Sequence, residues 1–445
     1  MENIFTDADA WYDHYESIEN LDEQIAFYHE TFDKIEDVVA NDFDDVIVEG
    51  IFDIIEKLTT DKKNDALETF IDTIREKQAP FYKLQFHYFI KDLLTYYLHI
   101  GNDEKAKFYL NDFIANPDSD IDIYLSINGL IGLYGKDDWT KELVEQYFAK
   151  PQDDKGYSVS SVKRSLATAI QPVITQKYYL LAQETGIFDY EQWNEDLKPY
   201  SIDFDEIKNL VCPLFEAKYY KDVILLDIED NYYALQIHFL FARYMKEELD
   251  MPFSASYPMA KLYVEYWLGL KKQKSFVLDS ELYREHLNDQ TDFLDFYSYQ
   301  LYVGAFGVVY FYDFLLAMEI IDEELHSSAI AISHGLKKEL LKGSDLAWQN
   351  NGFIKKWKKP TAYSVEEFQE VLDHVETSLT DNTERKAGES FFRFETKRLK
   401  NPINVRSFFD APREIGAIAG SNVQRKKPER KKKAKPKPKN KKKKK

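Results

Sequence analysis

Glycine and proline recur at nearly constant spacing in the first third of the chain. Gly101 and Gly135 are 34 residues apart, and each lies in a polar break between apolar stretches. Pro80, Pro117 and Pro151 follow at spacings of 37 and 34 residues, and each is suited to end a helix. A unit of this length predicts antiparallel helix pairs stacked as a solenoid, because one pair cannot bury its apolar face alone.

The apolar residues between these breaks have helical spacing. Leu67, Phe70, Ile71 and Ile74 recur at intervals of three and four residues, as on the buried side of an amphipathic helix. Only 16 glycines and 14 prolines occur in 445 residues, which argues against a β protein rich in tight turns. The sequence therefore predicts an all-α protein in which stacked helical hairpins continue into a larger helical region.

One of these units resembles a tetratricopeptide repeat. The residues that match the family's helix-A aromatic, turn glycine, small helix-B residue, large apolar residue and terminal proline are Tyr97, Gly101, Ala106, Leu110 and Pro117. Partial matches in the neighbouring units are Ala66, Phe70 and Pro80 before it, and Gly135, Val144 and Pro151 after it, with Ile131 and Thr140 departing from the pattern. The resemblance covers about residues 45–151 and implies a scaffold for other proteins, although a generic array of helical hairpins would share these features.

Changes in composition divide the chain into four parts. A polar break follows Pro151, and the charge changes sign after Asp381. The predicted parts are a tetratricopeptide-like hairpin array (1–151), a second helical region with buried apolar helices (152–381), a basic-aromatic arm (382–424) and a Lys-rich tail (425–445). The phenylalanines of the arm, Phe391, Phe392, Phe394, Phe408 and Phe409, either dock on the helical body or stack on unpaired nucleic-acid bases. Docking is the favoured interpretation.

Residues 301–321 are apolar enough to span a bilayer, with only Asp313 and Glu319 charged. An aspartate near the centre of a span is costly, and no Lys or Arg occurs between Arg284 and Lys337 to anchor one. We therefore expect a buried central helix and no membrane span. The acidic N-terminus lacks the basic and apolar regions of a secretory signal.

The tail inverts the charge of the rest of the chain. It has fifteen basic residues and one acid, a net charge of +14, which leaves the preceding residues near −34. The predicted polyanion-binding residues are Arg425, Lys426, Lys427, Arg430, Lys431, Lys432, Lys433, Lys435, Lys437, Lys439, Lys441, Lys442, Lys443, Lys444 and Lys445. Such a segment cannot bury enough apolar surface to order itself, so we expect disorder. It could bind the phosphates of RNA or DNA, act as a nuclear localisation signal, fold back on the acidic body, or serve only to solubilise.

Motifs of known chemistry are absent from the sequence. There is no phosphate-binding loop, nucleophile elbow or paired Cys motif, and the single cysteine, Cys212, excludes an intrachain disulfide. One Glu-x-x-His, Glu323 to His326, has Glu319 one helical turn earlier and suggests a metal-dependent enzyme as an alternative. No catalytic residue, metal site or cofactor is predicted otherwise.

These features together favour a non-enzymatic scaffold or adaptor. We expect a protein partner on the helical body and a polyanion, RNA or a ribonucleoprotein, on the tail. The metal-dependent enzyme is one alternative to this scaffold. A second alternative is that the acidic body mimics a nucleic acid. The expected location is cytoplasmic, or nuclear in a eukaryotic cell, and the oligomeric state stays open.

Overall fold

A computed structural model describes residues 4–117, 119–149, 157–228, 230, 232–269, 276–290, 299–343, 347–380 and 394. Within these residues every regular element is helical, with eighteen α-helices, five short 3-10 helices and no strand. The prediction of an all-α fold is thereby confirmed.

The helices follow one another with short connections. The first nine are α1 (Ala8–Glu16), α2 (Leu21–Lys34), α3 (Asp44–Thr60), α4 (Asn64–Lys77), α5 (Ala79–Ile100), α6 (Asp103–Ala115), α7 (Ile121–Leu133), α8 (Asp137–Ala149) and α9 (Tyr157–Thr185). The others are α10 (Tyr190–Leu197), α11 (Lys208–Glu216), α12 (Tyr233–Leu249), α13 (Phe253–Gly269), α14 (Ser280–Asp289), α15 (Tyr299–Ala317), α16 (Glu323–Gly343), α17 (Ala347–Asn351) and α18 (Val365–Thr377). The 3-10 helices are η1 (Ile4–Thr6), η2 (Lys198–Tyr200), η3 (Asp205–Ile207), η4 (Tyr220–Asp222) and η5 (Gly352–Lys356).

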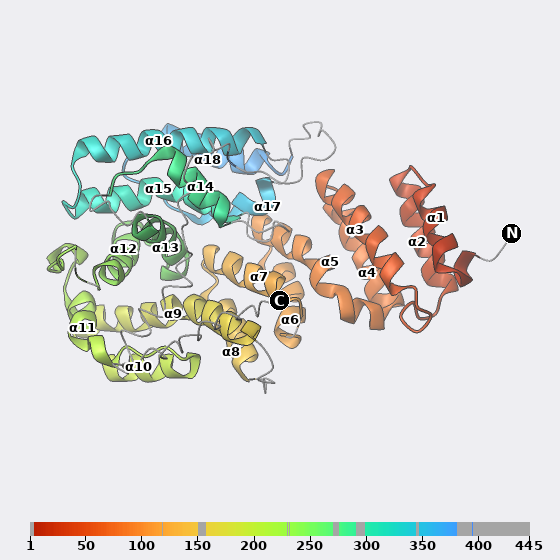
Figure 1. Cartoon of the computed structure of the whole chain (residues 1–445), viewed down its shortest axis with the longest axis horizontal. Coiled ribbons are helices and arrows are strands. Elements are labelled where there is room, and N and C mark those ends of the chain that lie inside the picture. The colour runs from red at the N-terminus through yellow and green to blue at the C-terminus, as the bar shows by residue number, and fades with distance from the viewer. Residues whose placement is uncertain are drawn as a thin grey trace, which may run out of the picture.

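Helices α1 to α8 form a continuous stack of antiparallel neighbours. The odd-numbered helices make one row, since α1 packs on α3, α3 on α5 and α5 on α7, and even-numbered helices pack likewise, α2 on α4 and α6 on α8. Figure 1 shows this stack ending in α1–α4, which extend away from the later helices. The stack does not stop near residue 151, because α9 packs on both α7 and α8. The tetratricopeptide resemblance and the division into domains stay predictions.

The residues from which helix pairs were predicted lie at the buried and turn positions that such pairs require. Leu67, Phe70 and Ile74 are all buried on α4. Gly101 and Gly135 have φ of +76° and +69° in the turns that join α5 to α6 and α7 to α8, a conformation that favours glycine. One expectation needs correction: Pro80 lies in the first turn of α5, where its missing N–H costs nothing, and so it begins a helix.

The predicted apolar helix is α15. Among the described residues it is the one helix long and apolar enough to cross a membrane, but 83% of that apolar stretch is buried inside the protein. It packs on α12, α13, α14, α16 and α17. The expectation of a buried central helix is confirmed.

The chain returns to the early stack near its C-terminal end. Helices α17 and η5 both pack on α5, beside which α17 is seen in Figure 1. The next helix, α18, begins with a capping box in which Ser364 and Glu367 each bond the other's backbone N–H. Residues 347–356, which form α17 and η5, are called the cover segment below.

Candidate functional site

All fifteen basic residues predicted to bind a polyanion, in 425–445, lie outside the described residues. The same holds for Phe391, Phe392, Phe408 and Phe409 of the arm. Phe394 is described, and its ring is buried, with 2% of the residue exposed. For this one phenylalanine, docking on the helical body is confirmed.

The residues considered for a metal do not form a cluster. Helix α15 ends at Ala317 and α16 begins at Glu323, so Glu319 lies in the connection, where its φ is +56°. The expectation that Glu319 lies one helical turn before Glu323 on the same face is therefore wrong. Within the described ranges, no group of three or more His, Cys, Asp or Glu side chains is placed to hold a metal ion.

His326 instead has a structural partner. Its Nε2 lies 2.8 Å from Oδ1 of Asp313, and Oδ2 of Asp313 accepts a hydrogen bond of 3.0 Å from the backbone N–H of Ala362. Burial raises the pKa of the Asp313 carboxyl. Asp313 thus joins α15 to α16 and to the segment before α18, which explains how a charged residue is accommodated in an apolar helix.

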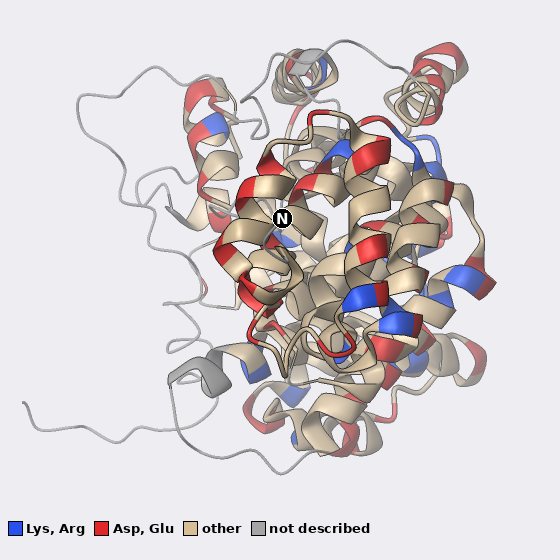
Figure 2. Cartoon of the chain, turned by 90° about the vertical axis from the view of Figure 1, so that its right-hand side faces the viewer, with Lys and Arg blue, Asp and Glu red and all other residues tan. Residues whose placement is uncertain are grey.

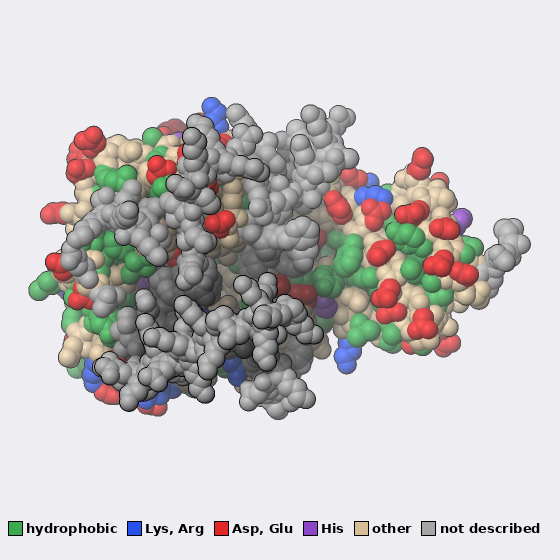
Figure 3. Space-filling model, viewed as in Figure 1, with side chains coloured by type: hydrophobic (Ala, Val, Ile, Leu, Met, Phe, Trp, Pro, Cys, Tyr) green, Lys and Arg blue, Asp and Glu red, His purple; other side chains and the backbone are tan. Residues whose placement is uncertain are grey.

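The described surface has an acidic groove at the N-terminal end of the stack. Its volume is about 670 Å³. The lining residues come mainly from α1 and α3 and are Tyr12, Tyr15, Glu16, Ile18, Glu19, Gln24, Glu49, Gly50, Asp53 and Lys57. Four of them carry carboxylates and one is basic, so the groove favours a cationic ligand. Figure 3 shows acidic side chains interspersed with hydrophobic ones over this end of the molecule.

Part of this groove is already held by hydrogen bonds. The Tyr15 hydroxyl donates to Asp53 Oδ2 at 3.0 Å, and Lys57 Nζ lies 2.6 Å from the same oxygen. Desolvation is the largest cause that raises the pKa of the Tyr12 hydroxyl, and the nearby carboxylates of Glu16 and Glu49 raise it further. The lone lysine of the groove is thus engaged by Asp53, and Glu16, Glu19 and Glu49 supply the remaining negative charge.

An aromatic strip continues the groove along the odd-numbered row. Phe52 lies three residues after Glu49 and so shares its side of α3. Its ring is 40% exposed and meets Tyr88 of α5 edge-on, with centroids 5.2 Å apart. Leu84, four residues before Tyr88, is 52% exposed. We call Phe52, Leu84 and Tyr88 the aromatic strip. Rings next to carboxylates suit the aliphatic stems and charged heads of Lys and Arg.

Farther along α5, the same face is covered by the chain itself. Leu84, Tyr88, Asp92 and His99 are spaced by four, four and seven residues and therefore share one face of the helix. Asp92 accepts a bond of 2.9 Å from Gln349 of the cover segment. His99 Nδ1 lies 2.9 Å from the carbonyl oxygen of Trp348, a residue that is 0% exposed. The cover segment occupies this part of the face.

The cover fits too closely to admit a larger residue at its centre. A Cβ added to Gly352 would lie 2.3 Å from the Tyr134 hydroxyl and 2.4 Å from His99 Nδ1. Phe353 meets the Tyr134 ring edge-on, with centroids 6.2 Å apart. Burial lowers the pKa of His99 to about 4, so the imidazole is neutral at physiological pH. The cover segment therefore contacts α5 as closely as residues contact one another inside a protein core.

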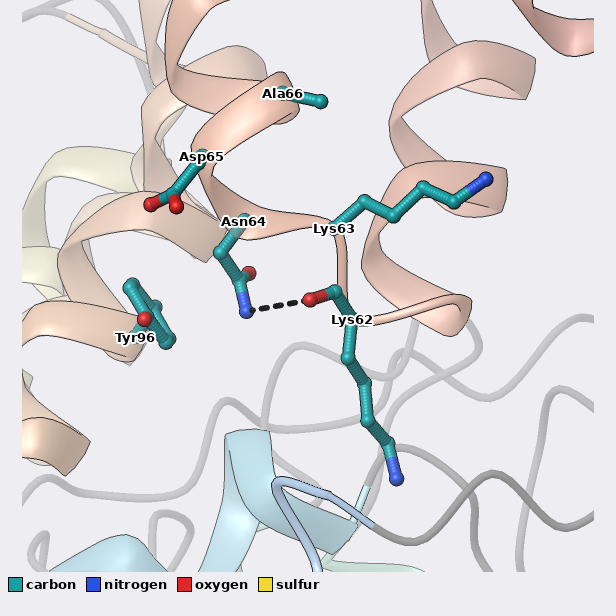
Figure 4. Close-up of a pocket in the computed structure, with 6 residues that line it drawn as sticks. All are labelled: Lys62, Lys63, Asn64, Asp65, Ala66 and Tyr96. Carbon is teal, nitrogen blue, oxygen red and sulfur yellow. Dashed lines mark hydrogen bonds between the residues drawn. The ribbon is translucent and has the colours of Figure 1, made fainter.

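A second hollow, about 320 Å³, lies at the start of α4. Figure 4 shows its lining, with Asn64 donating to the carbonyl oxygen of Lys62 at 3.5 Å and the ring of Tyr96 nearby. Lys63 is paired with Asp61 at 3.1 Å, and Asp65 adds a further negative charge. Because these charges offset one another, this hollow has no charge preference comparable with that of the acidic groove.

Viewed from the N-terminal end, Asp and Glu are spread over several helices, with Lys and Arg among them (Figure 2). The alternative that the acidic body mimics a nucleic acid stays a prediction. Sequence reasoning missed the groove because its carboxylates come from α1, α3 and the connection after α1, although Glu49 and Asp53 at a spacing of four were a visible signal.

No family model, curated protein or solved structure matches this chain.

Proposed function

We propose that the protein is a non-enzymatic helical scaffold that joins two ligands of opposite charge. Its body binds a Lys- or Arg-rich segment of a protein partner in the acidic groove and along the aromatic strip. Its tail binds a polyanion, RNA or a ribonucleoprotein. The observation that carries the proposal is the separation of charge, near −34 before residue 425 and +14 after it.

Electrostatics supports the assignment of the tail. A basic segment that neutralises phosphates releases their counterions, so its affinity falls steeply as salt is added. The acidic body repels the same polyanion, and binding is therefore expected to depend on the tail.

The acidic groove supports the assignment of the body. It is open, whereas the cover segment fills the corresponding face of α5 beyond Asp92. Four carboxylates beside exposed rings match the charge and the aliphatic stems of a basic segment, and the lone Lys57 is already engaged by Asp53.

The tail is tested with fluorescent single-stranded RNA in a salt titration. We compare the full chain with one that ends at Gly420. The full chain should bind with a steep dependence on salt, by about 0.7 in log K per log salt for each neutralised phosphate, and truncation should abolish most of that binding. Equal binding by both chains would show that the tail assignment is wrong.

The groove is tested with a fluorescent Lys-rich peptide and the chain that ends at Gly420. Glu16→Gln with Glu49→Gln should weaken binding roughly two- to tenfold, since each exposed ion pair contributes below about 1 kcal/mol. Glu184→Gln with Glu216→Gln removes the same charge from α9 and α11 and should leave affinity unchanged. An equal loss in both double variants would show that net charge, and not the groove, holds the peptide. Tight binding of a peptide of residues 425–445 in the groove would instead indicate that the tail occupies it.

A further inference from the structure

The side-chain amide of Asn288 holds Phe394, the one residue of the C-terminal arm that the structure describes. The backbone N–H of Phe394 donates to Oδ1 of Asn288 at 2.9 Å, and Nδ2 of Asn288 donates to the carbonyl oxygen of Phe394 at 2.8 Å. Both backbone groups of this residue are therefore satisfied by one side chain. An asparagine amide can do this because it offers a donor and an acceptor side by side.

The docked residue contributes an apolar contact as well. Phe394 is 2% exposed and belongs to the apolar core, although it is 106 residues from Asn288 in sequence. On α14, Asn288 lies four residues after Arg284, whose guanidinium pairs with Glu339 of α16. Positions four apart share a helix face, so the arm is held on the side of α14 that faces α16.

Two other carboxamides hold irregular segments in the same way. Gln78 accepts from the N–H of Val38 at 3.1 Å and donates to the carbonyl oxygen of Ile35 at 2.7 Å. Gln236 accepts from the N–H of Leu226 at 2.8 Å and donates to the carbonyl oxygen of Ile224 at 2.9 Å. Both segments join consecutive parts of the fold. Because this arrangement recurs, it indicates that the contact made by Asn288 serves to fix a segment of the chain to a helix.

We propose that Asn288 and the buried site of Phe394 form an anchor that fixes the C-terminal basic segment to α14. The ligand of this site is a phenylalanine with its own backbone N–H and carbonyl oxygen, supplied by the chain itself. With the anchor in place, the tether to Arg425 starts at Phe394 and not at Thr380, which shortens it from 45 to 31 residues. A shorter tether confines the tail nearer to one place on the body. That consequence for polyanion binding rests on the proposed function, whereas the anchor does not.

Limited trypsin digestion of the full chain tests the anchor without any nucleic acid. Arg393 and Lys397 flank Phe394, so an anchored segment resists cleavage there. Phe394→Ala and Asn288→Ala should each speed cleavage after Arg393 roughly tenfold or more, because each removes part of what holds the segment. Phe408→Ala is the matched control and should leave the rate unchanged. Cleavage after Arg393 at the wild-type rate in both variants would overturn the proposal.

A peptide added in trans separates loss of the anchor from loss of folding. A fluorescent peptide of residues 388–400 should bind the full chain carrying Phe394→Ala, whose site is empty, at least tenfold more tightly than it binds the wild-type chain. It should lose that binding when Asn288→Ala is added. Failure of the peptide to bind the Phe394→Ala chain, with unchanged helical circular dichroism, would overturn the proposal even if RNA binding by the tail is observed.

Discussion

The two halves of one helix face are used in opposite ways. Near Leu84 and Tyr88, this face of α5 forms part of the aromatic strip, which continues the acidic groove of α1 and α3, and Leu84 is 52% exposed. Near Asp92 and His99, the same face is sealed by Gln349 and Trp348, and the imidazole of His99 is neutral. We therefore expect the sealed half to contribute stability, and the open half, with the acidic groove beside it, to contribute little. Variants in the two halves should therefore differ in what they change.

The largest effect is expected from Trp348→Ala in the sealed half. Removing a fully buried tryptophan should lower the free energy of unfolding by about 3–5 kcal/mol, through lost burial and the cavity left behind. Urea denaturation followed by circular dichroism measures it. Ile224→Ala is the control, because Ile224 is 88% exposed and its truncation should change stability by less than about 0.5 kcal/mol. Similar losses in both variants would mean that the cover segment is not tightly held.

The second-largest loss of stability is expected in the sealed half when the pH is lowered, through His99. The pKa of His99 is about 4 in the folded chain against an ordinary value of 6.5, so between these values the unfolded state binds more protons. The contribution of His99 is thus fully present above pH 6.5 and is lost as pH falls to 4, by about 3 kcal/mol at most.

Comparison with His99→Gln isolates this effect. Burial also lowers the pKa values of His238 and His286 to about 4, and both remain in the variant. Urea denaturation at a series of pH values should show a shallower loss of stability in His99→Gln than in the wild type. Parallel curves for the two proteins would contradict a buried, neutral His99.

A smaller loss is expected from Gly352→Ala. The new Cβ would overlap the Tyr134 hydroxyl and the His99 ring, so shifting them should cost about 1–3 kcal/mol of unfolding free energy. Gly335→Ala within α16 is the matched control. No atom lies within 4 Å of its added Cβ, and alanine should stabilise the helix by up to about 1 kcal/mol. Thermal melts of the two variants should shift in opposite directions.

The smallest effect on stability is expected in the open half. Glu16→Gln with Glu49→Gln removes two carboxylates from a groove with an excess of negative charge, and the free energy of unfolding should change by less than about 0.5 kcal/mol. The same double variant should lose affinity for the Lys-rich peptide. A large loss of stability would show that Glu16 and Glu49, like the sealed half, contribute to the stability of the fold.

Short sequence patterns predicted the features that depend on residues close together in the sequence. The stripe of Leu67, Phe70 and Ile74 predicted α4, because this signal lies within about two helical turns. The position of the cover segment depends on contacts between residues some 250 positions apart, such as the 249 between His99 and Trp348. No short pattern carries that information.

The candidate site was less predictable for the same reason. The groove exists only because α1 packs on α3, which brings Glu16 near Glu49. The expected placement of Glu319 beside Glu323 was wrong because Glu319 adopts a left-handed conformation between the end of α15 and the start of α16. A four-residue spacing does not reveal where one helix stops.

The three carboxamide contacts have a consequence for how the molecule responds to ionic strength. Gln78, Gln236 and Asn288 hold their segments with uncharged groups, so added salt screens nothing in these contacts. Under the proposed function the tail attracts phosphates, and that attraction, in contrast, should weaken as salt is added. At high ionic strength any polyanion bound to the tail should therefore be released while the three carboxamide contacts stay in place, and lowering the salt should restore binding without any refolding.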